Sequence, residues 1–291
     1  KIESIKLICS ITKIKSFPFF DLLSKFPSNN LSSLCITGVI FGCNDNQFDW
    51  LRNFRFLKEI WFEGNKNATL RFFMRFLRDF PFSTKLSKLT FREDRILSRF
   101  DMEEISSDYV YCANLKNLCS LDIMGTSISG LGLMRLISYF DESKMKKINF
   151  GDCPFIKIEN MVSFENPFVL PPSFLFTALP QLEDLIIPQL GTLNDQSMSV
   201  LRAEVNNMPQ LKRLDLALNP SITGVAIYDL LKALKDLRLE PLDQLNIDGC
   251  AAVSHITIGM LKSQGLIKTI SCSYERELWR KFGINSFIYK K

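Results

Sequence analysis

Apolar residues recur along the chain in one short pattern, apolar-x-x-apolar-x-apolar, with Leu, Ile, Met or Phe at the apolar positions. Successive starts are separated by 29, 26, 29, 32, 27, 37, 29, 31 and 24 residues. Self-similarity at such a step indicates a repeat array, in which each unit stacks on the next. The pattern starts at Ile2, Leu31, Leu57, Leu86, Leu118, Met145, Leu182, Leu211 and Leu242, and in degraded form at Leu266.

Each repeat is predicted to contain a strand and then a helix. The apolar-x-apolar end of the pattern is a short strand, because alternate strand residues point to the same side. Between strands, apolar residues follow a helical period over 68–80, 130–140, 197–208 and 224–234. Residues 1–291 are therefore expected to form a single α/β solenoid of about ten repeats. Parallel strands would line its concave side and helices its convex side.

Two long steps and the C-terminal tail depart from the pattern. The insertions at 93–114 and 158–176 are expected to be loops, either harmless bulges or partner contacts. The tail, 274–291, carries Leu278, Trp279 and Phe282 at helical spacing. It is predicted to cap the last repeat, with a partner-binding peptide as the alternative.

A polar or thiol residue follows the strand in several repeats. Asn65, Asn219, Cys153 and Cys250 hold this position, three residues after the last apolar position of the pattern. Inside a solenoid, such a side chain can bond the backbone of neighbouring turns, where an unpaired amide or carbonyl would be costly. These residues are therefore interpreted as structural, and the two thiols as small buried groups.

The strand residue between two inward apolar residues must face away from the core. This central column contains an anomaly, since Trp61 has little reason to face solvent unless something covers it. Aromatic and arginine side chains are typical of interface hot spots. The column reads Lys6, Cys35, Trp61, Thr90, Asp122, Asn149, Ile186, Asp215, Asn246 and Ile270.

A partner-binding site is predicted around Trp61 on this concave face. The alternative is that the N-terminal segment or the tail packs over Trp61. The predicted site comprises Trp61, Glu59, Glu63, Lys88, Arg92, Asp122, Lys147 and Asn149.

Composition narrows the function classes. The chain is 46% hydrophobic and 23% charged, which is typical of globular proteins. Its formal charge of +5 is a mild excess, too small to imply nucleic-acid binding. No run of about 18 apolar residues occurs, so no membrane span is predicted. The chain begins with Lys1 and is expected to be a piece of a longer protein.

The cysteines and the single histidine predict neither metal binding nor catalysis. The eight cysteines are scattered and no Cys-x-x-Cys occurs, so a zinc site is not expected. The thiols are expected to be reduced. His255 starts a predicted convex helix, away from the strand face, and no phosphate-binding loop motif is present. We therefore expect no enzyme activity, no metal and no cofactor.

Two segments carry a family resemblance. The units at 121–153 and 214–250 both contain a strand, Ser-Ile-Ser/Thr-Gly, a helix pattern and a second strand that ends in Cys. They resemble leucine-rich repeats of the ribonuclease-inhibitor-like and cysteine-containing types. The cysteine-ended form is similar to that of F-box proteins, the substrate receptors of SCF ubiquitin ligases. This resemblance implies a horseshoe-shaped solenoid that holds a protein substrate on the concave face or its C-terminal rim.

The resemblance also implies a place in the cell and a set of partners. An F-box outside this sequence would dock on the SCF adaptor, in the nucleus or cytoplasm. The abundance of Lys, Asn, Ile and Phe is similar to that of fungal proteins, and the replicative helicase is one candidate substrate. Two alternatives remain, a repeat scaffold or regulator without a ubiquitin role and an extracellular ectodomain. The scattered cysteines argue against the second, because extracellular repeats usually have disulfide-bonded caps.

Overall fold

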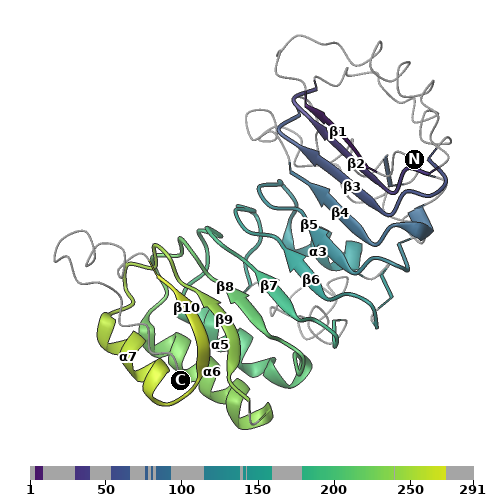
Figure 1. Ribbon diagram of the computed structural model, residues 1–291. Coiled ribbons are helices and arrows are strands. Elements are labelled where there is room, and N and C mark those ends of the chain that lie inside the picture. The colour runs from purple at the N-terminus through teal and green to yellow at the C-terminus, as the bar shows by residue number, and fades with distance from the viewer. Residues whose placement is uncertain are drawn as a thin grey trace, which may run out of the picture.

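Ten parallel strands form one continuous sheet in chain order (Figure 1). The computed structural model describes residues 4–8, 30–39, 54–65, 76–77, 80, 83–92, 115–137, 140–141, 143–158, 179–238 and 240–272. The strands are β1 (Ser4–Ile8), β2 (Ser33–Thr37), β3 (Glu59–Glu63), β4 (Lys88–Phe91), β5 (Ser120–Asp122), β6 (Lys147–Asn149), β7 (Asp184–Ile186), β8 (Arg213–Asp215), β9 (Leu242–Asn246) and β10 (Ile267–Ser271). One strand per repeat confirms the predicted α/β solenoid.

The helices lie between strands, as the 3.6-residue period predicts. They are η2 (Ser83–Lys85), α3 (Gly130–Ile137), α5 (Asp195–Ala203), η6 (Val205–Asn207), α6 (Gly224–Arg238) and α7 (His255–Ser263). The run predicted at 197–208 is divided at Glu204 into α5 and η6. Helix α5 starts earlier than predicted because Asn194 caps it, its Oδ1 accepting the Ser197 amide at 3.0 Å. Most of the run 68–80 lies outside the described residues.

The core lies between the sheet and the helices. In the patterns of β2 to β9 the two apolar residues point inward, as with Leu214 and Leu216, which are 2% and 0% exposed. Helix α6 contributes Leu230, Leu231 and Leu234 from one face. Burying such a side chain stabilises the fold by about 1.5–3 kcal/mol. Since one repeat cannot cover its own apolar face, the stacking of repeats builds the core.

Buried asparagines tie successive repeats together. The Asn65 side chain accepts the Val39 amide at 3.0 Å and donates to the Ile36 carbonyl at 2.9 Å. Asn65 follows β3, and Asn219 occupies the same position after β8, five repeats later, where it accepts the Leu190 amide at 2.9 Å. Its Nδ2 group donates to the carbonyls of Ile187, Leu216 and Ala217. Both asparagines are 0% exposed, so they satisfy backbone groups that water cannot reach.

Two cysteines take the same position in other repeats. The Cys153 thiol donates to the Ile123 carbonyl at 3.3 Å, and the Cys250 thiol donates to the Leu216 carbonyl at 3.1 Å. Burial raises the pKa of Cys153 to about 11, against a smaller lowering by its hydrogen bond with Thr126. Burial also raises the pKa of Cys250. These thiols are therefore neutral hydrogen-bonding groups, in keeping with the structural interpretation.

The residue just before this polar position turns the chain out of the strand. It has a positive φ in each of the seven repeats where the structure describes it: Gly38, Gly64, Gly125, Asp152, Gln189, Leu218 and Gly249. Left-handed backbone costs a non-glycine residue roughly 1–2 kcal/mol, with Asp and Asn tolerating it better. Leu218, with φ 59° and 53% exposure, is the least expected of them.

The last repeat corrects one detail of the predicted columns. Ser271 pairs with Asn246, and Ile270 pairs with the buried Leu245. The central column therefore ends in Ser271, and Ile270 takes an inward position against the core. The error arose because the degraded pattern was aligned on Leu266, one residue too early.

Several predictions fall outside the described residues or are only partly covered. The insertion at 93–114, nearly all of 158–176 and the tail 274–291 belong to this group. In the described part of the chain, no helix combines the length and apolar character that crossing a membrane requires.

The buried asparagines that join successive repeats should tolerate substitution less well than exposed asparagines. Asn219→Ala should lower the free energy of unfolding by about 2–4 kcal/mol, because it leaves several buried backbone groups unpaired. Urea unfolding would measure the change. The exposed Asn206→Ala, in η6, is the matched control and should stay within about 0.5 kcal/mol of the parent. Equal stability of the two variants would contradict this joining role.

The thiol environments predict a labelling pattern. Cys119, Cys153 and Cys250 form no disulfide, and we expect all eight cysteines of the sequence to be reduced. Alkylation after unfolding without reductant should therefore label eight thiols by mass spectrometry. In the folded chain at pH 8, Cys153 should react far more slowly than the partly exposed Cys35, because its thiolate is disfavoured. A stable disulfide, or equal rates, would contradict this pattern.

Candidate functional site

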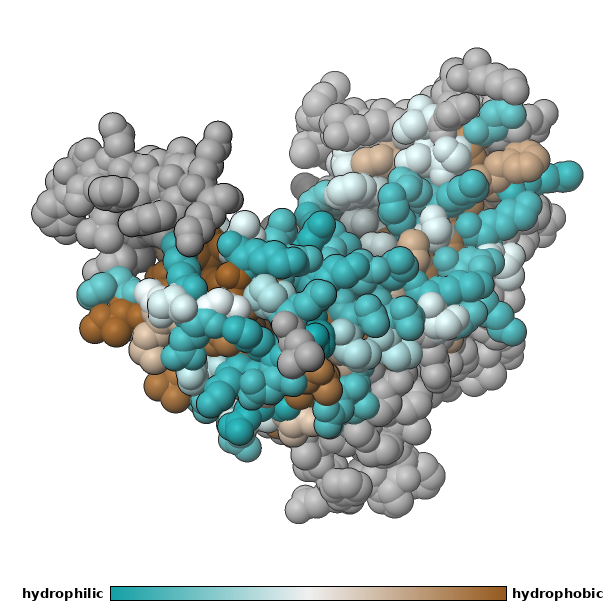
Figure 2. Space-filling model, turned by 60° about the horizontal axis from the view of Figure 1, so that its bottom comes forward, coloured by the Kyte–Doolittle hydropathy of each residue, from teal (hydrophilic) through white to brown (hydrophobic). Residues whose placement is uncertain are grey.

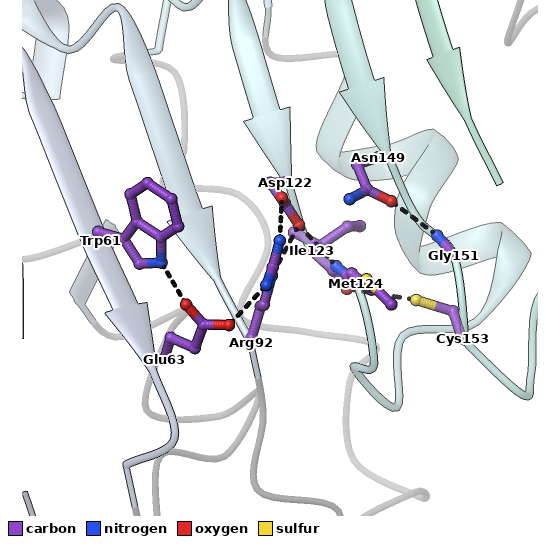
Figure 3. Close-up of polar contacts among 9 residues, drawn as sticks. All are labelled: Trp61, Glu63, Arg92, Asp122, Ile123, Met124, Asn149, Gly151 and Cys153. Atoms are coloured by element: carbon purple, nitrogen blue, oxygen red, sulfur yellow. Dashed lines mark hydrogen bonds and ion pairs between the residues drawn. The ribbon is translucent and has the colours of Figure 1, made fainter. Parts of the chain in front are cut away.

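Trp61 lies at the centre of β3 and faces away from the core. It pairs with Cys35 on one side and Thr90 on the other. Its two strand neighbours, Ile60 and Phe62, are buried, while Trp61 is 43% exposed. The indole Nε1 donates to Glu63 Oε2 at 2.9 Å, so the ring is held at its polar edge (Figure 3). Trp61 is therefore an oriented, accessible apolar surface on a rigid sheet.

Arg92 links Glu63, which holds Trp61, to Asp122 on β5. Its NH1 donates to Glu63 Oε1 at 2.5 Å, and its NH2 donates to Asp122 Oδ2 at 2.9 Å (Figure 3). A longer contact of 3.4 Å joins Nε to Asp122 Oδ1, which makes the Asp122 contact two-pronged. The hydrogen bond with Asp122 is the main cause that raises the Arg92 pKa, and Glu63 adds to it. The network Trp61–Glu63–Arg92–Asp122 spans three adjacent strands.

The remaining predicted site residues are less tightly joined. Lys88 and Glu59 form an exposed ion pair at 2.6 Å, and the Glu59 hydrogen bond raises the Lys88 pKa. Such a pair contributes little to stability but presents both charges to a partner. Lys147 is partly exposed and makes no ion pair with the described residues. Asn149 is only 5% exposed.

The acidic and amide residues of the central column have a structural task that the sequence reading missed. Asn149 Oδ1 accepts the Gly151 amide at 3.1 Å, and Asp122 Oδ1 accepts the Met124 amide at 3.1 Å (Figure 3). Asp215 and Asn246 bond the residue two positions on in the same way. This local turn is a known use of Asp and Asn. Its sequence signal is the Asp or Asn recurring at one strand position.

The C-terminal half of the concave face is hollowed. Ile186 is partly buried and lines this region together with the apolar residues Leu214, Leu245 and Ile270. Arg213 and Asp184 lie beside it and form a 3.5 Å ion pair. Of the hollow's lining residues, the predicted site includes Lys147 alone. The hollow is lined by Lys147, Asp184, Ile186, Arg213, Leu214, Asp215, Gln244, Leu245, Asn246, Thr269, Ile270 and Ser271.

The single histidine lies away from the strand face. His255 is the first residue of α7, directly after the cap Ser254, and so belongs to the helical side as predicted. Within the described ranges, no cluster of three or more His, Cys, Asp or Glu side chains could hold a metal ion.

Removing Arg92 from the network it forms with Glu63 and Asp122 should lower the stability of the fold. Arg92→Ala should lower the free energy of unfolding by about 1–2 kcal/mol, because it leaves Glu63 and Asp122 as neighbouring unpaired carboxylates. Lys88→Ala is the control, since it removes a more exposed pair and should cost less than about 0.5 kcal/mol. Chemical denaturation of both variants tests the contrast, and equal costs would show that the network adds nothing beyond a surface pair.

No protein-family model matches the chain. The chain is 39% identical over 308 residues to Protein DIA2 of Saccharomyces cerevisiae, covering 99% of this chain and 42% of that protein. It is 32% identical over 284 residues to Protein DIA2 of Eremothecium gossypii, covering 96% and 40%. The chain thus spans about two fifths of the length of these curated relatives.

Solved structures share the fold at low sequence identity. The leucine-rich-repeat protein LegL7 of Legionella pneumophila superimposes with a TM-score of 0.51 at 15% identity, covering 93% of this chain and 82% of that one. Rad7, in its crystal structure with Elc1 in yeast, gives 0.50 at 14% identity, covering 87% and 65%. Together with the ten-stranded parallel sheet, these likenesses show that the chain has the fold of a leucine-rich-repeat solenoid.

Proposed function

We propose that the chain is a protein-recognition module that binds a protein partner on its concave face. The observation that carries this proposal is Trp61, a tryptophan 43% exposed at the centre of a strand and oriented by Glu63. Aromatic residues held in this way on a rigid surface are typical anchors of protein interfaces. The sheet fixes their position, so a partner would meet a preorganised surface.

The polar residues around Trp61 give the site its specificity. Glu63, Arg92 and Asp122 hold each other in place, so a partner would meet charges fixed in position. Glu59 and Lys88, at the amino ends of β3 and β4, form an exposed ion pair that a partner's charges could replace. A partner segment with an apolar residue for Trp61 and flanking charges of both signs would match this pattern.

We further propose that these are the substrate-binding repeats of an F-box subunit of an SCF ubiquitin ligase. Cys153 and Cys250 bond the backbone in the way expected of cysteine-ended repeats, which supports the resemblance on which this proposal rests. Rad7, which shares the fold, was crystallised with a protein partner, Elc1. On this proposal the protein acts inside the cell, in the nucleus or cytoplasm. The replicative helicase is the first candidate substrate to examine.

Substitutions on the concave face should weaken partner binding without unfolding the chain. Trp61→Ala should reduce affinity about fivefold or more, the loss typical of a hot-spot residue. Lys88→Glu should act mainly on the association rate. Full-length protein carrying each change would be purified from cells, and co-purifying proteins quantified by mass spectrometry. Val225→Ala on the opposite, helical side is the control, since Val225 is 70% exposed.

The same purification separates the two levels of the proposal. Recovery of a cullin and its adaptor with every variant, and loss of one substrate with Trp61→Ala alone, is the expected result. A partner lost with Trp61→Ala, but no cullin or adaptor in any sample, would indicate a scaffold without a ubiquitin role. Normal recovery of all partners by a folded Trp61→Ala protein would overturn the concave site.

A further inference from the structure

Charge is divided between the two ends of the strands. We define the amino-end edge as residues 54–59, 83–88, 115–120, 141–147, 179–184 and 208–213, which lead into β3 to β8. In sequence this edge contains the acidic residues Glu59, Asp141, Glu142, Glu183 and Asp184. Twice as many basic residues oppose them: Arg55, Lys58, Lys85, Lys88, Lys116, Lys144, Lys146, Lys147, Lys212 and Arg213.

The carboxyl ends of the same strands have the opposite balance. The residues that end these strands and turn the chain, 63–65, 91–92, 122–126, 149–153, 186–190 and 215–219, contain Glu63, Asp122, Asp152 and Asp215 with one cation, Arg92. The modest net charge of the whole chain therefore conceals a strongly basic edge and an acidic edge. Such a division creates a local field that the composition alone does not reveal.

Backbone hydrogen bonds hold the basic edge in a fixed row. The Lys58 carbonyl accepts the Ser87 amide at 2.8 Å, and the Cys119 carbonyl accepts the Lys146 amide at 2.9 Å. The Lys146 carbonyl accepts the Glu183 amide at 2.8 Å, and the Glu183 carbonyl accepts the Lys212 amide at 2.8 Å. Since neighbouring strands lie about 4.8 Å apart, these side chains line one continuous edge. Figure 2, which brings the lower side of Figure 1 forward, shows a broad hydrophilic band over this part of the molecule.

The carboxylates on the edge do not neutralise it. Glu183 is shared between Lys146 at 3.0 Å and Lys212 at 2.9 Å, so one negative charge serves two lysines. The hydrogen bond from Lys212, followed by that from Lys146, lowers the Glu183 pKa. Lys58 and Lys116 are exposed and form no ion pair within the described part of the chain. The edge therefore carries positive charge that the described carboxylates do not balance.

We propose that the amino-end edge is a second docking surface, which adjoins the concave site through Glu59, Lys88 and Lys147, and that it binds an acidic segment of a protein partner. A segment rich in Asp and Glu can form ion pairs with Lys58 and Lys116 along the row. Such a contact would steer association, and it would weaken as salt screens charges beyond about 8–10 Å.

A protein fits this edge better than nucleic acid does. Glu59, Glu183 and Asp184 stand among the cations and would repel a uniformly charged phosphate chain. A protein segment can place a basic or neutral residue opposite each of them. The exposed aromatic residue described on the edge, Phe56, already has the Lys85 ammonium 5.3 Å from its ring centroid and offers no row of stacking surfaces.

The test compares two double charge reversals of equal size. Lys58→Glu/Lys116→Glu changes the edge, and Lys157→Glu/Lys232→Glu changes exposed lysines elsewhere on the chain. Binding of a fluorescent Asp/Glu-rich peptide, of its Asn/Gln counterpart and of a short DNA duplex would be followed by anisotropy at low and moderate salt. Circular dichroism and urea unfolding would establish that each variant is folded.

We expect the acidic peptide to bind the parent chain in a salt-dependent way, and the Asn/Gln peptide not to bind. The edge variant should weaken peptide binding at least about tenfold, while the control variant leaves it within about twofold. Equal weakening by both variants would overturn the proposal, because it would reflect net charge alone. Tighter binding of the duplex than of the peptide, lost in the edge variant, would overturn the protein class of the partner.

Discussion

Every repeat of this solenoid depends on satisfying backbone groups that the stacking of repeats removes from water. An unpaired buried amide or carbonyl costs about 1–3 kcal/mol, comparable with the gain from burying a leucine. Asn65 and Asn219 meet that requirement with amide groups that both donate and accept. Cys153 and Cys250 meet part of it with a thiol. The register of the sheet, and hence the placement of Trp61 and the basic edge, follows from these joints.

The fold was predictable because its determinants are local and repeated. Two inward apolar residues per strand identify the strands, and the Asn or Cys that follows identifies the turn. Where the repetition weakens, prediction weakens with it, as in the last repeat, where Ile270 rather than Thr269 packs inward. Helix ends depended on single side chains such as Asn194, which the apolar period does not report.

The site was predictable only in part. The exposure of Trp61 follows from strand alternation, so its position could be derived. The Trp61–Glu63–Arg92–Asp122 network could not, because it depends on side-chain rotamers across strands that are about 30 residues apart. Asp122 also bonds the Met124 amide, and Asn149 bonds the Gly151 amide. The same side chains thus shape the turn and line the face, and a column of sequence letters does not distinguish these tasks.

The left-handed turns are unevenly distributed along the array. Gly38, Gly64, Gly125 and Gly249 hold this position in four of the described repeats, whereas three consecutive repeats have Asp152, Gln189 and Leu218. The backbone strain of the described left-handed turns is therefore concentrated in the repeats of β6, β7 and β8. Because a non-glycine residue keeps a left-handed conformation only where its surroundings hold it, contacts with the neighbouring repeats must offset this cost at Asp152, Gln189 and Leu218.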